Sequence, residues 1–221
     1  MGDLLSQILP LTFAAAISPT VLTVAVLVLS SKERPVARTV AYAVGCWIVL
    51  LVIGLPAISL FADASATRTP APWMRWVDLA SGITLLALGA RRLARKPTPH
   101  EKQGSKAGKL ANAGLRDYVV LGLALMITNF TTLVLYLPVL KGIARAPITG
   151  GVQLAVLLVC QVIILLPVLV PLLIRVLIPG PASKILGTVN AFTAKHTSVI
   201  MTVILLVFGV YLTAKGVSEL N

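Results

Sequence analysis

The sequence predicts an all-α integral membrane protein with six transmembrane helices, arranged as two inverted three-helix repeats. Three observations lead to this fold class. Of the 221 residues, 57% are hydrophobic and 12% are charged, and the mean hydropathy is +0.96, far above that of soluble domains. Six apolar stretches each have the length of about 20 residues that crosses a bilayer as a helix. The polar interruptions of the first half also recur in the second half.

The six apolar stretches are expected to be membrane-spanning helices. None of them alternates apolar and polar residues, as the strands of a membrane barrel would. The first stretch follows a terminus without Lys or Arg and is too long for the core of a signal peptide, so we expect it to be a span. The expected spans cover residues 5–30, 38–62, 76–94, 117–140, 149–174 and 197–216.

The basic residues divide the connections between the spans into two groups. Fourteen of the 19 Lys and Arg residues follow the first, third and fifth spans. Because cytoplasmic loops carry the excess of basic residues, both termini are expected outside the cytoplasm, with the protein in the cytoplasmic (inner) membrane. The basic loop 95–116 has no Phe, Trp or Tyr for base stacking. Its charge therefore indicates orientation and contact with anionic lipid headgroups, and not nucleic-acid binding.

The sequence offers no combination of residues for catalysis, redox chemistry or metal binding. Cys46 and Cys160 form no CxxC pair, and His100 and His196 are isolated from other ligand types. Residues 104–110, GSKAGKL, lack the spacing of a phosphate-binding loop and the Ser or Thr after its lysine. We therefore expect no enzyme activity, no cofactor and no metal site.

All seven carboxylate residues are expected in loops or at the ends of spans. Ion and proton pathways usually keep ionisable groups in the interior of the bundle. This placement disfavours a carrier of divalent metals or a proton-driven cation carrier. A sodium site built from hydroxyl, amide and carbonyl oxygens stays open.

The two halves of the chain share the positions of their interruptions. Residues 18–20, Ser-Pro-Thr, interrupt the first span, and residues 128–129, Thr-Asn, interrupt the fourth. Pro56 and Pro167 are 111 positions apart. Because each half has three spans, the second copy must be inverted relative to the first. The expected units are a first repeat over 1–94, the basic loop 95–116 and a second repeat over 117–221.

A polar site near the membrane midplane is expected where the two interruptions meet. Pro19 has no N–H, so the carbonyls near residues 14 and 15 lose their helix partners, which lipid tolerates only where protein or a water-filled cavity satisfies them. The alternative is a kinked helix whose hydroxyls bond back to their own backbone, although the amide of Asn129 still needs partners. The candidate substrate-binding residues are Ser18, Pro19, Thr20, Thr23, Thr128, Asn129, Thr131 and Thr132.

Residues 179–196 predict a short helix near 181–195 that lies in the cytoplasmic membrane interface. After Pro-Gly-Pro, apolar residues recur at helical intervals between flanking lysines. A solvated linker is the alternative. With the helix formed, Arg175, Lys184 and Lys195 are expected to make a basic entry for an anionic lipid headgroup.

A row of small residues on the second span permits close contact with another helix. Ala37, Ala41 and Gly45 are spaced four residues apart. The partner helix belongs either to this chain or to a second copy, and we favour a homodimer.

The first two spans also resemble a known family. The segment AAAISPTVLTVAVLVLSSKERPVARTVAYAVG at residues 14–45, the six spans, the basic loop and the paired halves are similar to the peptidoglycolipid-addressing (sulfolipid-1-addressing) proteins of actinobacteria, within the lysine-exporter superfamily. Much of that superfamily has a Pro-Gly-Pro-type break in the first helix, whereas this chain has Ser18-Pro19-Thr20. The departure disfavours an amino-acid substrate and agrees with the glycolipid branch. The resemblance implies export or flipping of a lipid-linked molecule across the cytoplasmic membrane.

Three functions are compatible with the sequence. A transporter or flippase for a glycolipid or similar amphiphile is favoured by the paired halves and the polar residues at midplane. The alternatives are a membrane scaffold that assists a lipid export or synthesis complex, and a small-solute exporter of the same superfamily. The expected partners are membrane lipids, a lipid-linked or amphiphilic substrate and proteins of envelope-lipid synthesis or export.

Overall fold

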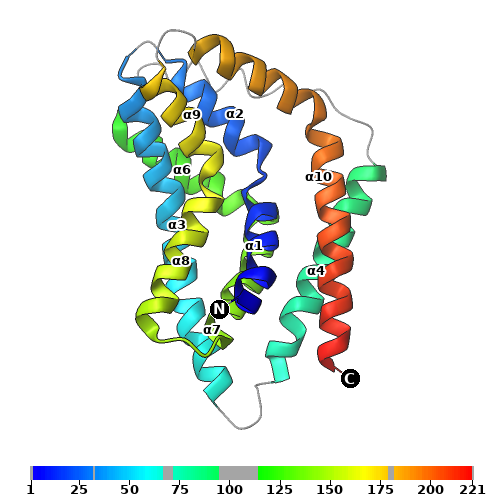
Figure 1. Cartoon of the computed structure of the whole chain (residues 1–221). Coiled ribbons are helices and arrows are strands. Elements are labelled where there is room, and N and C mark those ends of the chain that lie inside the picture. Colours follow the sequence, from blue (N-terminus) through cyan, green and yellow to red (C-terminus); the bar gives the residue numbers. More distant parts are fainter. Residues whose placement is uncertain (1, 32, 67–71, 95–113, 179–181, 221) are drawn as a thin grey trace.

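The structure is a computed structural model that describes residues 2–31, 33–66, 72–94, 114–178 and 182–220 (Figure 1). Within these ranges the regular elements are all α-helices, which confirms the predicted all-α class, and each of the six predicted stretches is helical. Most of the basic loop 95–116 lies outside the described residues. The helices are α1 (Gly2–Ala16), α2 (Pro19–Leu29), α3 (Pro35–Ala66), α4 (Pro72–Ala94), α6 (Leu115–Thr128), α7 (Phe130–Arg145), α8 (Gly150–Ile164), α9 (Leu166–Leu177) and α10 (Ala182–Leu220).

Several of these helices are long and apolar enough to cross a membrane. Two pass this test alone, over Pro35–Asp63 in α3 and Lys195–Ser218 in α10. Three bent pairs pass it when each pair is taken as one span, which gives up to five in the described residues. Helix α4, the predicted third span, is not among them. Its charged residues Asp78, Arg91 and Arg92 lower its hydropathy, so this span stays a prediction.

Each bent pair has a local cause for its bend. Helices α1 and α2 meet at 54°, with Pro19 as the first residue of α2, and α8 and α9 meet at 68°, with Pro167 near the start of α9. Proline is favoured in the first turn of a helix and interrupts the helix before it. Helices α6 and α7 meet at 73° around Asn129, without a proline. By contrast, α3 continues through Pro56, so the matched prolines 56 and 167 have different effects.

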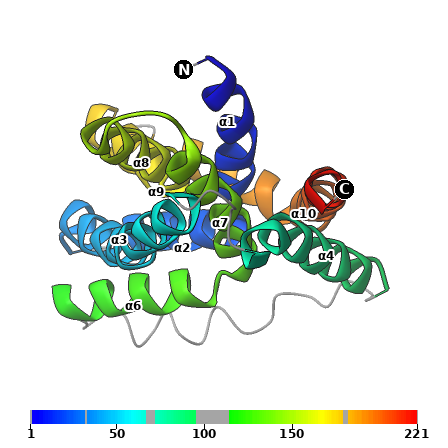
Figure 2. The same cartoon turned by 90° about the horizontal axis from the view of Figure 1, so that it is seen from below.

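The helices pack in pairs that join the two halves of the chain. Helix α4 runs alongside α10, and α3 alongside α6 (Figures 1 and 2). Helix α2 contacts α9 and α10, and α7 contacts α3 and α4. Both termini lie in the lower half of Figure 1. The site described below lies where α2 and α7 begin, between these two sets of contacts.

The close contact between α3 and α6 depends on two glycines. A Cβ atom on Gly45 would overlap the backbone of Val119, and one on Gly122 would overlap the backbone of Tyr42. Gly45 therefore uses its small size for a helix of the same chain. Ala37, at the other end of the row, is exposed, and the homodimer stays an untested prediction.

The segment predicted as a separate interfacial helix near 181–195 is the first part of α10, a single helix of 39 residues. Figure 1 shows this part, in orange, lying across the top of the bundle before the helix runs down beside α4. Leu186 is buried and packs with Val26 and Leu29 of α2. A solvated linker is therefore the wrong description of the segment.

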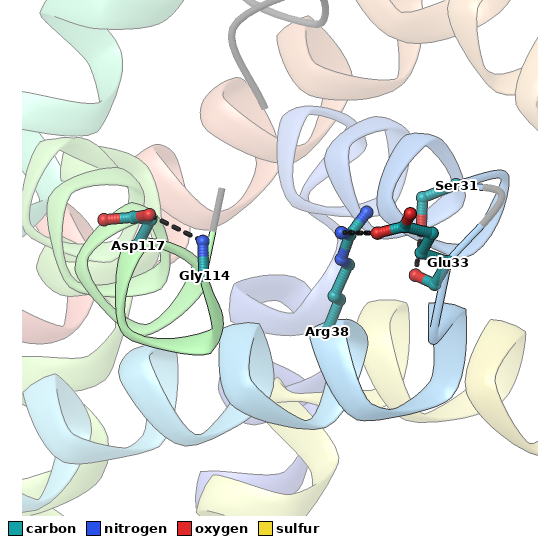
Figure 3. A network of polar contacts seen from close by, with 5 residues as sticks. All are labelled: Ser31, Glu33, Arg38, Gly114 and Asp117. Atoms are coloured by element: carbon teal, nitrogen blue, oxygen red, sulfur yellow. Dashed lines mark hydrogen bonds and ion pairs between the residues drawn. The ribbon is translucent and has the colours of Figure 1, made fainter. Parts of the chain in front are cut away.

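Charged residues make local contacts in the turn between α2 and α3 and at the start of α6, which Figure 3 shows as two separate groups. Arg38 pairs with Glu33 at 3.2 Å, and its guanidinium lies 5.4 Å from the ring centre of Tyr118 on α6. Asp117 accepts a hydrogen bond of 2.8 Å from the backbone N–H of Gly114, which caps α6. The contact between Arg38 and Tyr118 joins α3 to α6 at the end of the bundle predicted to be cytoplasmic.

Candidate functional site

The breaks in the first and fourth predicted spans meet in the structure. Asn129 Nδ2 donates a hydrogen bond of 3.0 Å to Ser18 Oγ. Ser18 stands directly before α2, and Asn129 directly before α7. Neither side chain caps the helix that follows it. The polar side chains of the two breaks therefore bind each other across the two halves of the chain.

The carbonyl freed by Pro19 also finds its partner in the other half. Pro19 lacks the N–H that would bond to the carbonyl of Ala15, four residues earlier. Thr132 Oγ1 of α7 donates a hydrogen bond of 3.0 Å to that carbonyl oxygen. Thr132 is 2% exposed and does not line the cavity described next, so its hydroxyl completes the backbone of the break.

A cavity of about 270 Å³ lies beside this junction. Its walls come from α2, α4, α6, α7, α10 and the residues at the two breaks. Polar and apolar side chains both contribute, and a single charged residue is among them. The lining residues are Ser18, Thr20, Val21, Leu88, Arg92, Leu125, Thr128, Asn129, Phe130, Thr131 and Met201.

The electrostatic character of the cavity is positive. Arg92, in the last turn of α4, is its charged lining residue, and the lining contains no carboxylate. The first turns of α2 and α7 both border the cavity, and the first N–H groups of a helix have no partner within it. Their partial positive charge favours an anion. The cavity therefore suits an anionic group that also accepts hydrogen bonds.

Five of the eight predicted site residues line the cavity, and three do not. Pro19 is buried, Thr23 is half-buried, and Thr132 bonds to the backbone as described above. For Thr128 the alternative prediction, a hydroxyl that bonds back to its own helix, is correct. Its hydroxyl donates to two carbonyls of α6, at 2.8 and 3.1 Å. The lining members are Ser18, Thr20, Thr128, Asn129 and Thr131.

Two of the three residues of the predicted basic entry lie away from this cavity, and the entry itself stays a prediction. Arg175 is half-buried in the last turn of α9, Lys195 is exposed on α10, and the side chain of Lys184 lies outside the described residues. Neither Arg175 nor Lys195 lines the cavity. Arg92, which the sequence analysis counted only as a basic residue that sets the topology, lines the cavity instead. The sequence signal that could have indicated Arg92 as a site residue is its position in the last turn of the third predicted span.

A second polar cluster was not predicted. Asp78 lies near one end of α4, as expected for a carboxylate, but its side chain is fully buried and pairs with Lys141 of α7. Sequence reasoning missed this pair because the two residues are 63 positions apart. In the part of the chain that the structure describes, no group of three or more His, Cys, Asp or Glu residues could hold a metal ion.

Bent apolar helices around a polar cavity define the class of the protein, which is a helical membrane protein. The family model for Sap, the sulfolipid-1-addressing protein, matches residues 8–218, and the chain belongs to this family. The family resemblance of the first two spans is thereby confirmed, while membership of the wider lysine-exporter superfamily stays a prediction. Comparisons with curated proteins and with solved structures gave no match.

Proposed function

We propose that this protein exports or flips an anionic amphiphilic lipid across the cytoplasmic membrane. The headgroup occupies the cavity at the two helix breaks, and the acyl chains stay in the surrounding lipid. The observation that carries the proposal is the cavity itself, which combines Arg92 with the first turns of α2 and α7. The family is named for the addressing of sulfolipid-1, and the acidic sulfur group of a sulfolipid matches this positive lining.

The size of the cavity supports a headgroup as its occupant. Drug-sized ligands usually occupy pockets of about 300–1,000 Å³, and this cavity has about 270 Å³. A whole lipid with long acyl chains does not fit in that volume. Exposed apolar side chains, Phe130 on the cavity wall and Ile127 beside it, give the chains an apolar surface next to the headgroup.

Transport is proposed to use six spans in two inverted repeats, with both termini outside. Ser18 and Asn129 are 111 positions apart and precede the second helix of their bent pairs. Helix α2 of the first half contacts α9 and α10 of the second half, and α7 of the second half contacts α3 and α4 of the first. Such matching contacts between the halves are expected when the two are related by inversion. Helix α4 has 23 residues, or about 34 Å of helix, enough to cross the hydrocarbon layer.

The proposal is tested with proteoliposomes that contain this protein alone. The probe is a fluorescent sulfated glycolipid in one leaflet, and the control probe is a zwitterionic lipid with the same acyl chains. We expect the protein to accelerate the movement of the sulfated probe above the rate in protein-free vesicles. No acceleration would contradict the proposal and favour a scaffold that needs other proteins. Movement of an entrapped amino acid without movement of lipid would favour a small-solute exporter.

A further inference from the structure

The two halves of the chain can be matched helix by helix. Ser18 and Asn129, which directly precede α2 and α7, are 111 positions apart. The last residues of α3 and α9, Ala66 and Leu177, have the same offset. This offset pairs α1 with α6, α2 with α7, α3 with α8 and α9 together, and α4 with α10. Each contact between helices can therefore be compared with its counterpart.

The contacts of α1 and α6 differ between the halves, although other contacts repeat. Helix α3 packs on α7 as α9 packs on α2, and α4 packs on α7 as α10 packs on α2. Helix α6, however, packs on α3, whereas its counterpart α1 packs mainly on α7 and less on α8. Among the described residues, α6 makes no comparable contact with α2. Figure 2 shows α1 and α6 on opposite sides of α7.

The contact between α1 and α7 is a closed interface. Ile8 and Leu11 of α1 are 1% and 2% exposed. Ile8 lies so close to Gly142 of α7 that a Cβ atom there would be 2.9 Å from its side chain. Further along α1, the carbonyl of Ala15 accepts the hydrogen bond from Thr132. The two helices are thus packed together from residue 8 to residue 15 of α1.

The corresponding position between α6 and α2 contains the cavity. Val21 of α2 and Leu125 of α6 both line it. At the offset of 111 positions, Val21 corresponds to Thr132, which in the other half bonds to α1. The cavity is therefore the counterpart of the contact between α1 and α7, with its two helices held apart.

We propose that α1 and α6 are the two gates of the cavity and that they exchange positions between two conformations. This inference rests on the proposed transport function and on the inverted repeats proposed with it. In the present conformation α1 closes the outer side, and α6, docked on α3, leaves the cytoplasmic side open. In the second conformation α6 leaves α3 and packs on α2, which closes the cavity over the headgroup. Helix α1 then moves from α7 toward α8 and opens the outer side.

Two glycines stabilise the present position of α6. Gly45 and Gly122 let α3 and α6 approach to backbone contact. The corresponding positions of the other half are occupied by Val156 of α8 and Leu11 of α1, whose larger side chains prevent such a close approach. Docking of α6 on α3 is therefore favoured over docking of α1 on α8. The conformation with an open cytoplasmic side is expected to be the more populated one.

Distances between spin labels test the exchange without any transport measurement. The full chain, with Cys46→Ala and Cys160→Ala, carries two introduced cysteines and is measured in nanodiscs by pulsed electron–electron double resonance. The first pair is Leu27→Cys on α2 and Arg116→Cys on α6, both at exposed positions. Its distance shortens when α6 closes on α2.

A second pair of labels follows the other gate. Leu5→Cys on α1 and Leu154→Cys on α8 are also at exposed positions, and their distance shortens when α1 moves toward α8. Each pair is expected to show two distances, with the longer one predominant. The two distances should differ by up to about 8–10 Å, the distance between the axes of packed helices. Because the gates exchange together, any change in conditions should shift both pairs in the same direction.

Glycine variants should shift the exchange in a known direction. In Gly45→Ala the added methyl group meets the backbone of Val119 on α6, which disfavours the docked position. The ratio of short to long distances should rise in both pairs by at least about fivefold, or roughly 1 kcal/mol. Gly122→Ala should act in the same way. Gly216→Ala is the matched control, because its methyl group meets the backbone of Leu79 between α10 and α4 and touches neither gate.

All forms are compared at equal helicity and monodispersity. A single distance in every form, a shift in one pair alone, or an equal shift in the Gly216→Ala control would overturn the proposal. Since the measurement contains no lipid substrate, such a result would leave the proposed transport function standing. Exchange of both gates in a protein that does not move the sulfated probe would instead support the gates and contradict the transport function.

Discussion

Ser18 and Asn129, 111 positions apart in the chain, are joined by a hydrogen bond of 3.0 Å, and each directly precedes the second helix of a bent pair. The contact places the interruption of the first half against that of the second. The first turns of α2 and α7, whose first backbone N–H groups have no partner within the helix, line the same cavity. The hydrogen bond thus marks the place where an anionic headgroup is held in the proposed mechanism.

The first prediction concerns the two members of this hydrogen bond. A single hydrogen bond contributes about 0.5–1.5 kcal/mol net, so removing one should slow transport by roughly tenfold or less. Asn129→Leu should cost more than Ser18→Ala, because it removes a donor and an acceptor and adds an apolar branch beside the cavity. The measurement is the transport rate of the sulfated probe per correctly inserted protein. Thr23→Ala, outside the cavity lining, is the control and should keep the parent rate.

The second prediction concerns the charge of the cavity. Arg92→Gln should slow movement of the sulfated probe by about tenfold. A hydrogen bond to a charged group contributes about 1.5–3 kcal/mol, and we take the lower value because the side chain of Arg92 is exposed. Movement of any zwitterionic lipid should change less. Arg91→Gln is the matched control, because Arg91 is exposed in the same turn but does not line the cavity. Equal effects of the two changes would show that only the general surface charge matters.

Local signals in the sequence predicted the helices and the positions of the two breaks. Pro19 and Asn129 could be recognised because each interrupts an apolar run. Pro19 lacks an N–H and therefore interrupts its helix whatever the helix packs against. The partner of the freed carbonyl could not be chosen, since Thr131 and Thr132 are adjacent and only the rotation of α7 decides that Thr132 reaches Ala15. The same limit hid the Asp78–Lys141 pair, which depends on how α4 and α7 face each other.

The third prediction concerns the close contact between α3 and α6. Gly45→Ala and Gly122→Ala should each lower stability by about 1–3 kcal/mol, the usual cost of overpacking, because the added methyl group meets backbone of the opposite helix. Gly187→Ala is the control: nothing lies near its Cβ, and alanine is the better helix former. The measurement is the thermal unfolding midpoint in detergent. An unchanged midpoint for Gly45→Ala would contradict the close α3–α6 packing.

The fourth prediction concerns topology. Because 14 of the 19 basic residues follow the first, third and fifth predicted spans, Gly114→Cys should be labelled by a membrane-impermeant reagent only from the cytoplasm. Ala66→Cys, at the end of α3, should be labelled only from outside. The experiment uses right-side-out and inverted vesicles from the same cells. Labelling of both positions from one side would contradict the six-span arrangement.

The last prediction concerns the break itself. In Pro19→Ala the new N–H can donate to the carbonyl of Ala15 and compete with the hydroxyl of Thr132 for it. A continuous helix would then remove the 54° bend between α1 and α2 and draw Ser18 away from Asn129. If alternation between two conformations requires this bend, the variant should lower the turnover rate of the sulfated probe more than it raises the half-saturating concentration. Pro10→Ala, at a proline inside α1 and away from the break, controls for the loss of a proline and should keep the turnover of the parent. Equal turnover of Pro19→Ala and the parent would mean that the bend is a passive kink, and transport would then have to use another part of the molecule.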